Sequence, residues 1–295
     1  MFTMTELFLY IQRFSDRIRH MIIDFHTHIW PDALAGRAME KLTNASDAYF
    51  NPVTDGTLKS LLSRMDEWHI DYSVIQPVVT KSSQIKTVNE FAHSINNDAE
   101  LSKRFVSFGG LWPLSPDYKN DIDYIVSLGL KGIKLHPEYQ LFEVDDPAMF
   151  KVYDYALSKD LILLFHAGAD PAFSEPFKSS PEKFASVIDN LKGGKIVLAH
   201  MGGHLQYQRL EKNLVGKNVF LDTSMGFEYY PKDWFVQVVK NHGSDKILFA
   251  SDSPWSNAKH EYESINELPL SQDEKDNILY KNACKLLGIR KSIIL

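Results

Sequence analysis

Eight short apolar runs alternate with longer amphipathic segments along this chain of 295 residues. The runs are rich in β-branched and aromatic residues and are apolar nearly throughout, as expected for parallel strands buried on both faces. Strands that alternate with helices pair in parallel through right-handed crossovers, and eight such units favour a closed (β/α)₈ TIM barrel; an open doubly wound sheet is the alternative. The runs are residues 22–26, 72–78, 104–111, 129–135, 161–166, 195–200, 218–224 and 246–252.

The segments between the runs place apolar residues at helical spacing. In residues 57–69, for example, Leu58, Leu61, Met65 and Trp68 recur every three or four positions and share one face of a helix. Similar patterns predict one helix after each of the other strands. These helices span 86–102, 119–128, 147–159, 181–192, 205–214, 232–242 and 272–287.

A single domain accounts for the barrel. Such a barrel takes about 250 residues, and no repeat, low-complexity stretch or linker interrupts residues 21–295. Residues 1–20 form an N-terminal extension whose apolar positions trace one face of an amphipathic helix. We expect this helix to pack on the barrel or on a neighbouring subunit, as in a homodimer. The alternative is that Met21 is the natural start; membrane association is not favoured.

Charge balance and cysteine content narrow the function classes. Asp and Glu total 38 against 32 Lys and Arg, a formal net charge of −6, which argues against nucleic-acid binding because that role usually shows as a basic excess. Cys284 is the one cysteine, so an internal disulfide and a Cys-rich zinc motif are both excluded, and a reducing, cytoplasmic setting is expected. No run is as long as the ~18 apolar residues of a membrane-spanning helix. The expected partner is a small-molecule substrate.

Metal-binding side chains stand where the predicted strands end, and in an α/β barrel the chemistry sits at these carboxyl ends. The first run ends in His26-Thr27-His28, the fifth in His166, and the eighth in Asp252. Side chains at positions i and i+2 of a strand point to one face, so the first two histidines can hold one ion. Because the last strand of a closed barrel lies beside the first, Asp252 can complete the set while one position stays open for water.

Other readings of these residues are open. A histidine at a strand end is often a satisfied polar group, and Asp252 could instead cap a helix that opens at Pro254. Lys134 and His136 share one face of the fourth strand. The lysine could be a solvated rim residue, an anion anchor or a carbamylated bridging ligand. Asp222, at the end of the seventh run, could orient a ligand imidazole.

The motifs at these strand ends resemble the amidohydrolase superfamily. They are DFHTH, GIKLHP, FHAG, AHMGG and ASDSPW, within a resemblance that covers roughly residues 21–288. The set is most similar to the amidohydrolase-related branch, which includes aminocarboxymuconate-semialdehyde decarboxylase, resorcylate decarboxylases and pyrone-dicarboxylate lactonases. Any one of these motifs alone would be weak, whereas together they form a specific combination.

This resemblance implies a metal centre and roles for the catalytic residues. It implies His26, His28, His166 and Asp252 as ligands of one divalent ion, with zinc (Zn²⁺) favoured over Mn²⁺, Fe²⁺ or Co²⁺. It also implies that Asp252 handles the proton of the attacking water. His200 matches a histidine that polarises the substrate in single-metal members and binds a second ion in two-metal members. Lys134 matches the bridging lysine of two-metal members.

We expect a metal-dependent hydrolase that attacks the carbonyl of a lactone, ester or amide. The alternative is non-oxidative decarboxylation of an unsaturated or aromatic acid on the same metal; a non-enzymatic binding protein fits the intact ligand set poorly. Decarboxylation would need a cationic clamp for the substrate, and Arg37 lies in the long segment 30–56, which we interpret as a loop or lid. The candidate substrate-binding residues are Lys134, His136, Trp30, Arg37 and Trp255. Trp30, Tyr49 and Phe50 are expected to form an aromatic wall, with Trp255 on the opposite rim.

Overall fold

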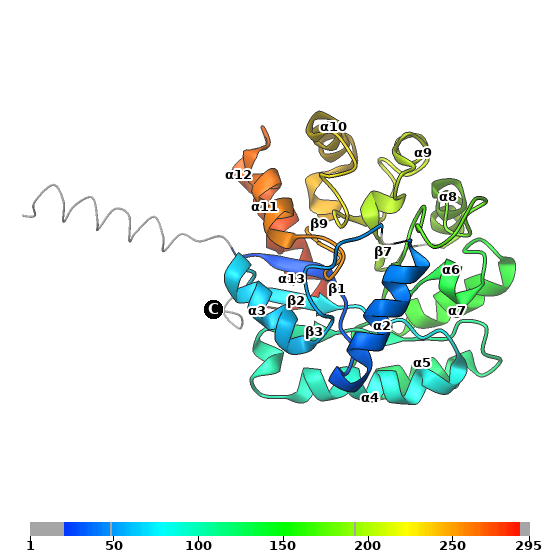
Figure 1. Ribbon diagram of the computed structural model, residues 1–295. Helices are drawn as coiled ribbons and strands as arrows, with labels where there is room; N and C mark the ends of the chain where they lie inside the picture. The colour runs from blue at the N-terminus through cyan, green and yellow to red at the C-terminus, as the bar shows by residue number, and fades with distance from the viewer. Residues whose placement is uncertain (1–20, 48, 192, 290–295) are drawn as a thin grey trace, which may run out of the picture.

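The computed structural model describes residues 21–47, 49–191 and 193–289. Short strands form the centre of this part of the chain, and helices surround them (Figure 1). Each predicted run contains a strand, and the third contains two, because the pairing changes partner at Phe108. The strands are β1 (Ile23–Thr27), β2 (Tyr72–Ile75), β3 (Phe105–Ser107), β4 (Gly109–Gly110), β5 (Gly132–Leu135), β6 (Ile162–Phe165), β7 (Ile196–Leu198), β8 (Phe220–Asp222) and β9 (Ile247–Leu248).

The strands pair in parallel and in sequence order, as predicted for a TIM barrel. The order is β1-β2-β3 in one sheet and β4-β5-β6-β7-β8-β9 in the other. Beyond the end of β9, single backbone hydrogen bonds link the last run to the first. Phe25 N donates to Phe249 O at 2.9 Å, and Asp252 N donates to His26 O at 2.8 Å. The expectation that Asp252 lies beside the first strand is therefore confirmed.

Most predicted helices are present, but the connections differ from the prediction in three ways. Residues 30–56 are not a loop, since they contain the 14-residue helix α2, in which only Ala35 and Met39 are buried. This sparse burial leaves little periodicity in the sequence. The helix after residue 256 was not expected, and the predicted last helix is divided by a π-helical turn at Asn277–Lys281. The helices are α2 (Asp32–Ala45), α3 (Leu58–Trp68), α4 (Ile85–Asn97), α5 (Tyr118–Ser127), α6 (Pro137–Gln140), α7 (Pro147–Ser158), α8 (Pro181–Asn190), α9 (Tyr207–Asn213), α10 (Lys232–His242), α11 (Ala258–Glu267), α12 (Gln272–Asp276) and α13 (Asn282–Leu287).

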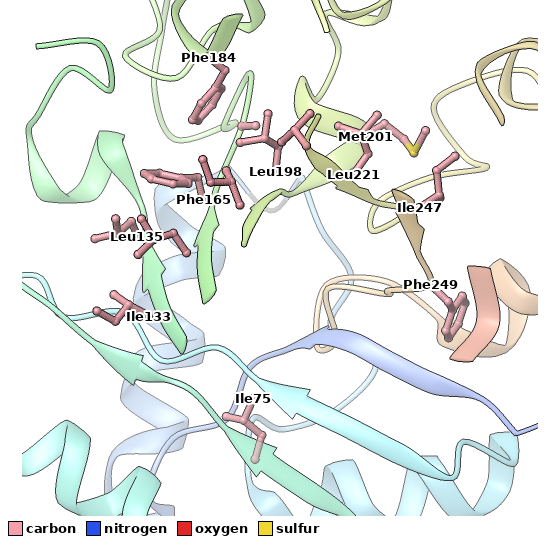
Figure 2. Close-up of a cluster of buried hydrophobic side chains, with 14 of the residues drawn as sticks. Ile75, Ile133, Leu135, Phe165, Phe184, Leu198, Met201, Leu221, Ile247 and Phe249 are labelled. Atoms are coloured by element: carbon pink, nitrogen blue, oxygen red, sulfur yellow. The ribbon is translucent and has the colours of Figure 1, made fainter. Parts of the chain in front are cut away.

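Side chains alternate along the strands between two buried clusters. In β6, Leu163 and Phe165 belong to the cluster that includes helix residues, and Phe165 packs against Phe184 of α8 at 5.5 Å between ring centres. Figure 2 shows this layer, with apolar side chains from successive strands and Phe184 beside Phe165. Ile162 and Leu164 belong to the other cluster. Because alternation continues past the strand, His166 turns to the same side as Leu164 and away from the helices.

The predicted helix over residues 1–20 lies outside the described residues. Among the helices that the structure describes, none has the length and apolar character needed to cross a membrane.

Candidate active site

Hydrogen bonds fix the rings of the two histidines on the first strand. His26 Nδ1 lies 2.9 Å from Asp222 Oδ2, and His28 Nδ1 lies 2.6 Å from the backbone oxygen of Gln76. Both acceptors are oxygens, so each ring donates from Nδ1 and keeps a lone pair on Nε2. The predicted role of Asp222 in orienting an imidazole fits this contact, which is the usual support for a histidine ligand of a metal.

Three potential ligand atoms converge at the end of β1. Asp252 Oδ1 lies 3.0 Å from His28 Nε2 and 3.3 Å from His26 Nε2, and the two nitrogens are 3.1 Å apart. Ligands held ~2.1 Å from a tetrahedral ion are ~3.4 Å from one another. Burial also lowers the pKa of His26 well below its usual value, which keeps the neutral form that binds a metal. The arrangement therefore fits a divalent ion.

His166 lies in the same region but in a second group. Its Nδ1 is 3.2 Å from His200 Nε2, while its Nε2 is buried and has no hydrogen-bond partner among the described residues. The structure contains a second group of potential ligand atoms, one each from His136, His166 and Asp170, which lie within 4.8 Å of one another. This group is separate from that of His26, His28 and Asp252. His166 as a ligand of the first group stays a prediction.

Lys134 is almost fully buried, and its surroundings exclude a solvated rim lysine. Its side chain is 1% exposed, and Nζ lies 2.8 Å from His26 Nε2. Burial lowers its pKa to about 8, although the carboxylates of Asp252 and Asp222 favour the charged form. A cation among these carboxylates fits the anion-anchor interpretation, whereas the lowered pKa fits the bridging-ligand interpretation, because only a neutral amine can be carbamylated.

Asp252 does not cap a helix, so that interpretation of the sequence is wrong. The next helix, α11, begins at Ala258 and is capped by Asn257, whose side chain accepts from the amides of Lys259 and His260. Asp252 instead has a left-handed backbone with φ of 69°. Burial alone would raise the pKa of its carboxyl group, but His26 and His28 offset this effect, and the pKa is lowered. The group is therefore a carboxylate at neutral pH.

A cavity of about 660 Å³ opens above these groups. Helix α2 forms part of its wall, and in Figure 1 this helix lies in front of the strands. Arg37 was predicted on a loop but is on this helix, one turn before Lys41, and both line the cavity. Tyr49 does not contribute to the wall, whereas the predicted metal ligands, catalytic residues and substrate-binding residues all do: His26, His28, Trp30, Arg37, Lys134, His136, His166, His200, Asp252 and Trp255.

Aromatic side chains cover another part of the cavity. Phe50 lies 5.8 Å from Trp255 between ring centres, so these two form one wall rather than the opposite rims that the sequence suggested. Trp30 stacks beside His28 at 6.4 Å. Tyr49 contacts Phe50 at 4.9 Å but is largely exposed. The cavity therefore combines a flat apolar surface with the polar groups at the strand ends.

Asp170 and His204 are among the polar residues of the cavity wall that sequence reasoning missed. Both lie in connections after strands, four residues beyond His166 and His200, where a turn can return the chain to the cavity. His136 Nε2 contacts Asp170 Oδ2 at 3.3 Å. The other groups were located because polar residues at the ends of buried strands face the site. Neither Asp170 nor His204 ends a strand, so this rule could not locate them.

Comparisons with known proteins agree with this architecture. The pattern of the amidohydrolase family matches residues 23–289. No curated protein sequence matches significantly. Among solved structures, 5-carboxyvanillate decarboxylase from Sphingomonas paucimobilis has a TM-score of 0.68 at 16% identity, covering 92% of this chain and 100% of that chain.

Two further structures show the same fold. A probable 2-pyrone-4,6-dicarboxylic acid hydrolase from Acinetobacter baumannii has a TM-score of 0.62 at 17% identity, covering 91% of this chain and 99% of that chain. A dihydroxybenzoic acid decarboxylase from Polaromonas sp. JS666, with bound manganese and an inhibitor, has a TM-score of 0.69 at 15% identity, covering 93% of this chain and 99% of that chain. The family match spans most of the sequence, and the chain therefore belongs to the amidohydrolase family.

Proposed function

We propose that this protein is a metal-dependent hydrolase that acts on the lactone, ester or amide carbonyl of a small acidic substrate. The observation that carries the proposal is the convergence of His26 Nε2, His28 Nε2 and Asp252 Oδ1 within 3.3 Å of one another. These three residues, with His166 as the fourth, would hold one divalent ion, for which zinc is our first choice. Manganese is supported by the ion bound in the Polaromonas structure.

A bound divalent ion supplies a Lewis acid that polarises the substrate carbonyl and makes water more acidic. The protein's own contribution to proton transfer is the carboxylate of Asp252. It lies beside the two imidazoles, and its lowered pKa keeps it available as a base at neutral pH. In this proposal it accepts a proton from the attacking water and returns it to the leaving group.

His200 is proposed to stabilise the oxyanion that forms on the substrate. Its Nδ1 lies 2.9 Å from Ser224 Oγ, which holds the ring, and its Nε2 faces the other histidines at the strand ends. The side chain is 4% exposed, so a hydrogen bond from this ring would act in a largely dry environment.

The acidic nature of the substrate is inferred from the cations on α2. Arg37 and Lys41 both line the cavity and are exposed at its mouth. In the described part of the chain, neither has an ion-pair partner. Two unpaired cations one helical turn apart suit a carboxylate, while Phe50 and Trp255 suit the apolar body that carries it.

Decarboxylation of an unsaturated or aromatic acid is the second candidate, and the same cations favour it. The fold does not separate the two reactions, because related barrels carry both kinds of chemistry. The fold matches include decarboxylases as well as a probable hydrolase.

The two reactions change the mass of the substrate in opposite directions. Zinc-loaded protein is incubated in H₂¹⁸O with carboxylate-bearing lactones, esters and amides, and with unsaturated and aromatic acids. Hydrolysis adds one labelled water to a substrate, whereas decarboxylation removes carbon dioxide, and mass spectrometry distinguishes them. We expect labelled hydrolysis products that disappear after chelation and return with zinc. Carbon dioxide release alone would favour the second candidate, and turnover that survives chelation would contradict both.

A further inference from the structure

His204 is a buried histidine that neither the metal centre nor the proposed proton transfers use. Its side chain is 2% exposed, and neither ring nitrogen has a hydrogen-bond partner among the described residues. Most buried polar side-chain atoms are hydrogen bonded, because leaving one unpaired costs about 1–3 kcal/mol. The residue lines the cavity, so whatever fills the cavity can supply the missing partner.

The backbone around His204 is fixed against the connection that follows β6. Its N donates to Ala167 O at 2.9 Å, and its O accepts from Ala169 N at 3.0 Å, which forms a bridge with Gly168. Gly168 has φ of +89°, and a Cβ there would lie 2.2 Å from His204 N. Only glycine permits this approach. The backbone that carries the imidazole is therefore held in place before any ligand arrives.

Two rings fix the position of the His204 side chain within the wall. Tyr229 contacts it edge to face, with 4.9 Å between the ring centres. The ring centre of His200 lies 5.6 Å from that of His204. His200 is the residue to which we assign the oxyanion. A group bound at His204 would therefore be part of the same molecule that reacts at the strand ends.

The charge state of the ring selects the kind of ligand group. Burial lowers the pKa of His204 to about 4, although the carboxylates of Asp252 and Asp170 favour the charged form. The ring is neutral at pH 7, with one donor and one acceptor nitrogen. Such a ring does not attract a second carboxylate strongly, but it hydrogen bonds readily to a hydroxyl group in either direction.

We propose that His204 is a specificity-determining residue that hydrogen bonds a hydroxyl group on the apolar body of the substrate. This inference rests on the proposed function, since it treats the cavity as the substrate site and the cations on α2 as the anchor for the acidic end. It adds that the preferred substrate is an acid whose apolar body carries a hydroxyl group, rather than an acid without one.

The test uses phenylacetate and its three ring-hydroxylated isomers as probes. Their binding to zinc-loaded protein is measured by titration calorimetry. We expect at least one isomer to bind the wild-type protein about threefold to tenfold more tightly than phenylacetate, which is the range of one net hydrogen bond. The variant His204→Phe keeps a ring against Tyr229. In this variant the hydroxylated isomer and phenylacetate should bind with about equal affinity, and the affinity for phenylacetate should stay as it is in the wild type.

Two further variants separate recognition from a structural role. His204→Gln keeps a donor and an acceptor and should retain part of the preference, which also tests the proposal if the phenylalanine variant fails to fold. His260→Phe is the matched control, because His260 is exposed on α11 and does not line the cavity. It should leave all four affinities unchanged.

The proposal is overturned if the hydroxyl preference persists in both His204 variants, or if none of the four compounds binds the wild-type protein. Either result leaves the proposed function intact when the protein still contains its metal and still shows chelator-sensitive turnover. Loss of metal-dependent turnover in the wild-type protein would instead contradict the proposed function itself.

Discussion

Replacing Asp252 with asparagine should lower turnover by about two orders of magnitude or more, the scale of a lost general base. The amide is nearly the same size and keeps an oxygen toward His28, but it is far too weak a base to accept a proton from water. Asparagine also tolerates the left-handed backbone found here, with φ of 69°, better than alanine would. Turnover on the substrate identified by the isotope assay and a thermal melt, both on one preparation, measure the effect.

Asp160→Asn is the matched control for this variant. Asp160 also has a left-handed backbone, with φ of 62°, but it is exposed and its contact is an ion pair with Lys195. Surface pairs of this kind contribute little to stability, so this control should behave as the wild type does. A folded Asp252→Asn protein with wild-type turnover would remove Asp252 from the mechanism.

Replacing His200 with asparagine should lower turnover by about 10²–10³ while the metal is retained. The loss follows because the asparagine amide reaches only as far as the Nδ1 position of the imidazole, so the donor to the developing oxyanion at the Nε2 position is missing. Asparagine suits the left-handed backbone of this position, where φ is 56°. Turnover and metal content are measured on the same sample, because the second quantity separates a substrate-polarising residue from a ligand.

His69→Asn provides the corresponding control. His69 has φ of 62° and ends α3 at an exposed position away from the cavity, so the substitution should change neither quantity. If His200→Asn loses its metal together with its activity, His200 is a ligand, and the assignment of its role is wrong.

The fold and the polar groups at the strand ends could be predicted because one physical rule connects them. Buried parallel strands are apolar, so a polar residue at the end of a strand stands out, and strand ends gather at one face of a barrel. His26, Lys134, His166 and Asp252 were all located in this way and all line one cavity. The same alternation that buries Leu164 turns His166 inward.

The remaining features depend on contacts that no local pattern records. Helix α2 has few buried positions, so its apolar periodicity is weak, and Arg37 was placed on a loop. His204 reaches the cavity only because Gly168 lets two connections approach closely. The grouping of His166 with His136 and Asp170 likewise depends on side-chain positions in space.

The metal content of the purified protein tests the central claim most directly. Protein produced in zinc-supplemented medium is analysed for its elements, beside His26→Ala and the control His260→Ala, which changes an exposed histidine outside the cavity. We predict about one divalent ion per chain in the wild type and in the control, and a clear loss in His26→Ala, because this change removes one of the three converging ligand atoms. A wild-type protein without stoichiometric metal, or a His26→Ala protein that keeps its full content, would contradict the account.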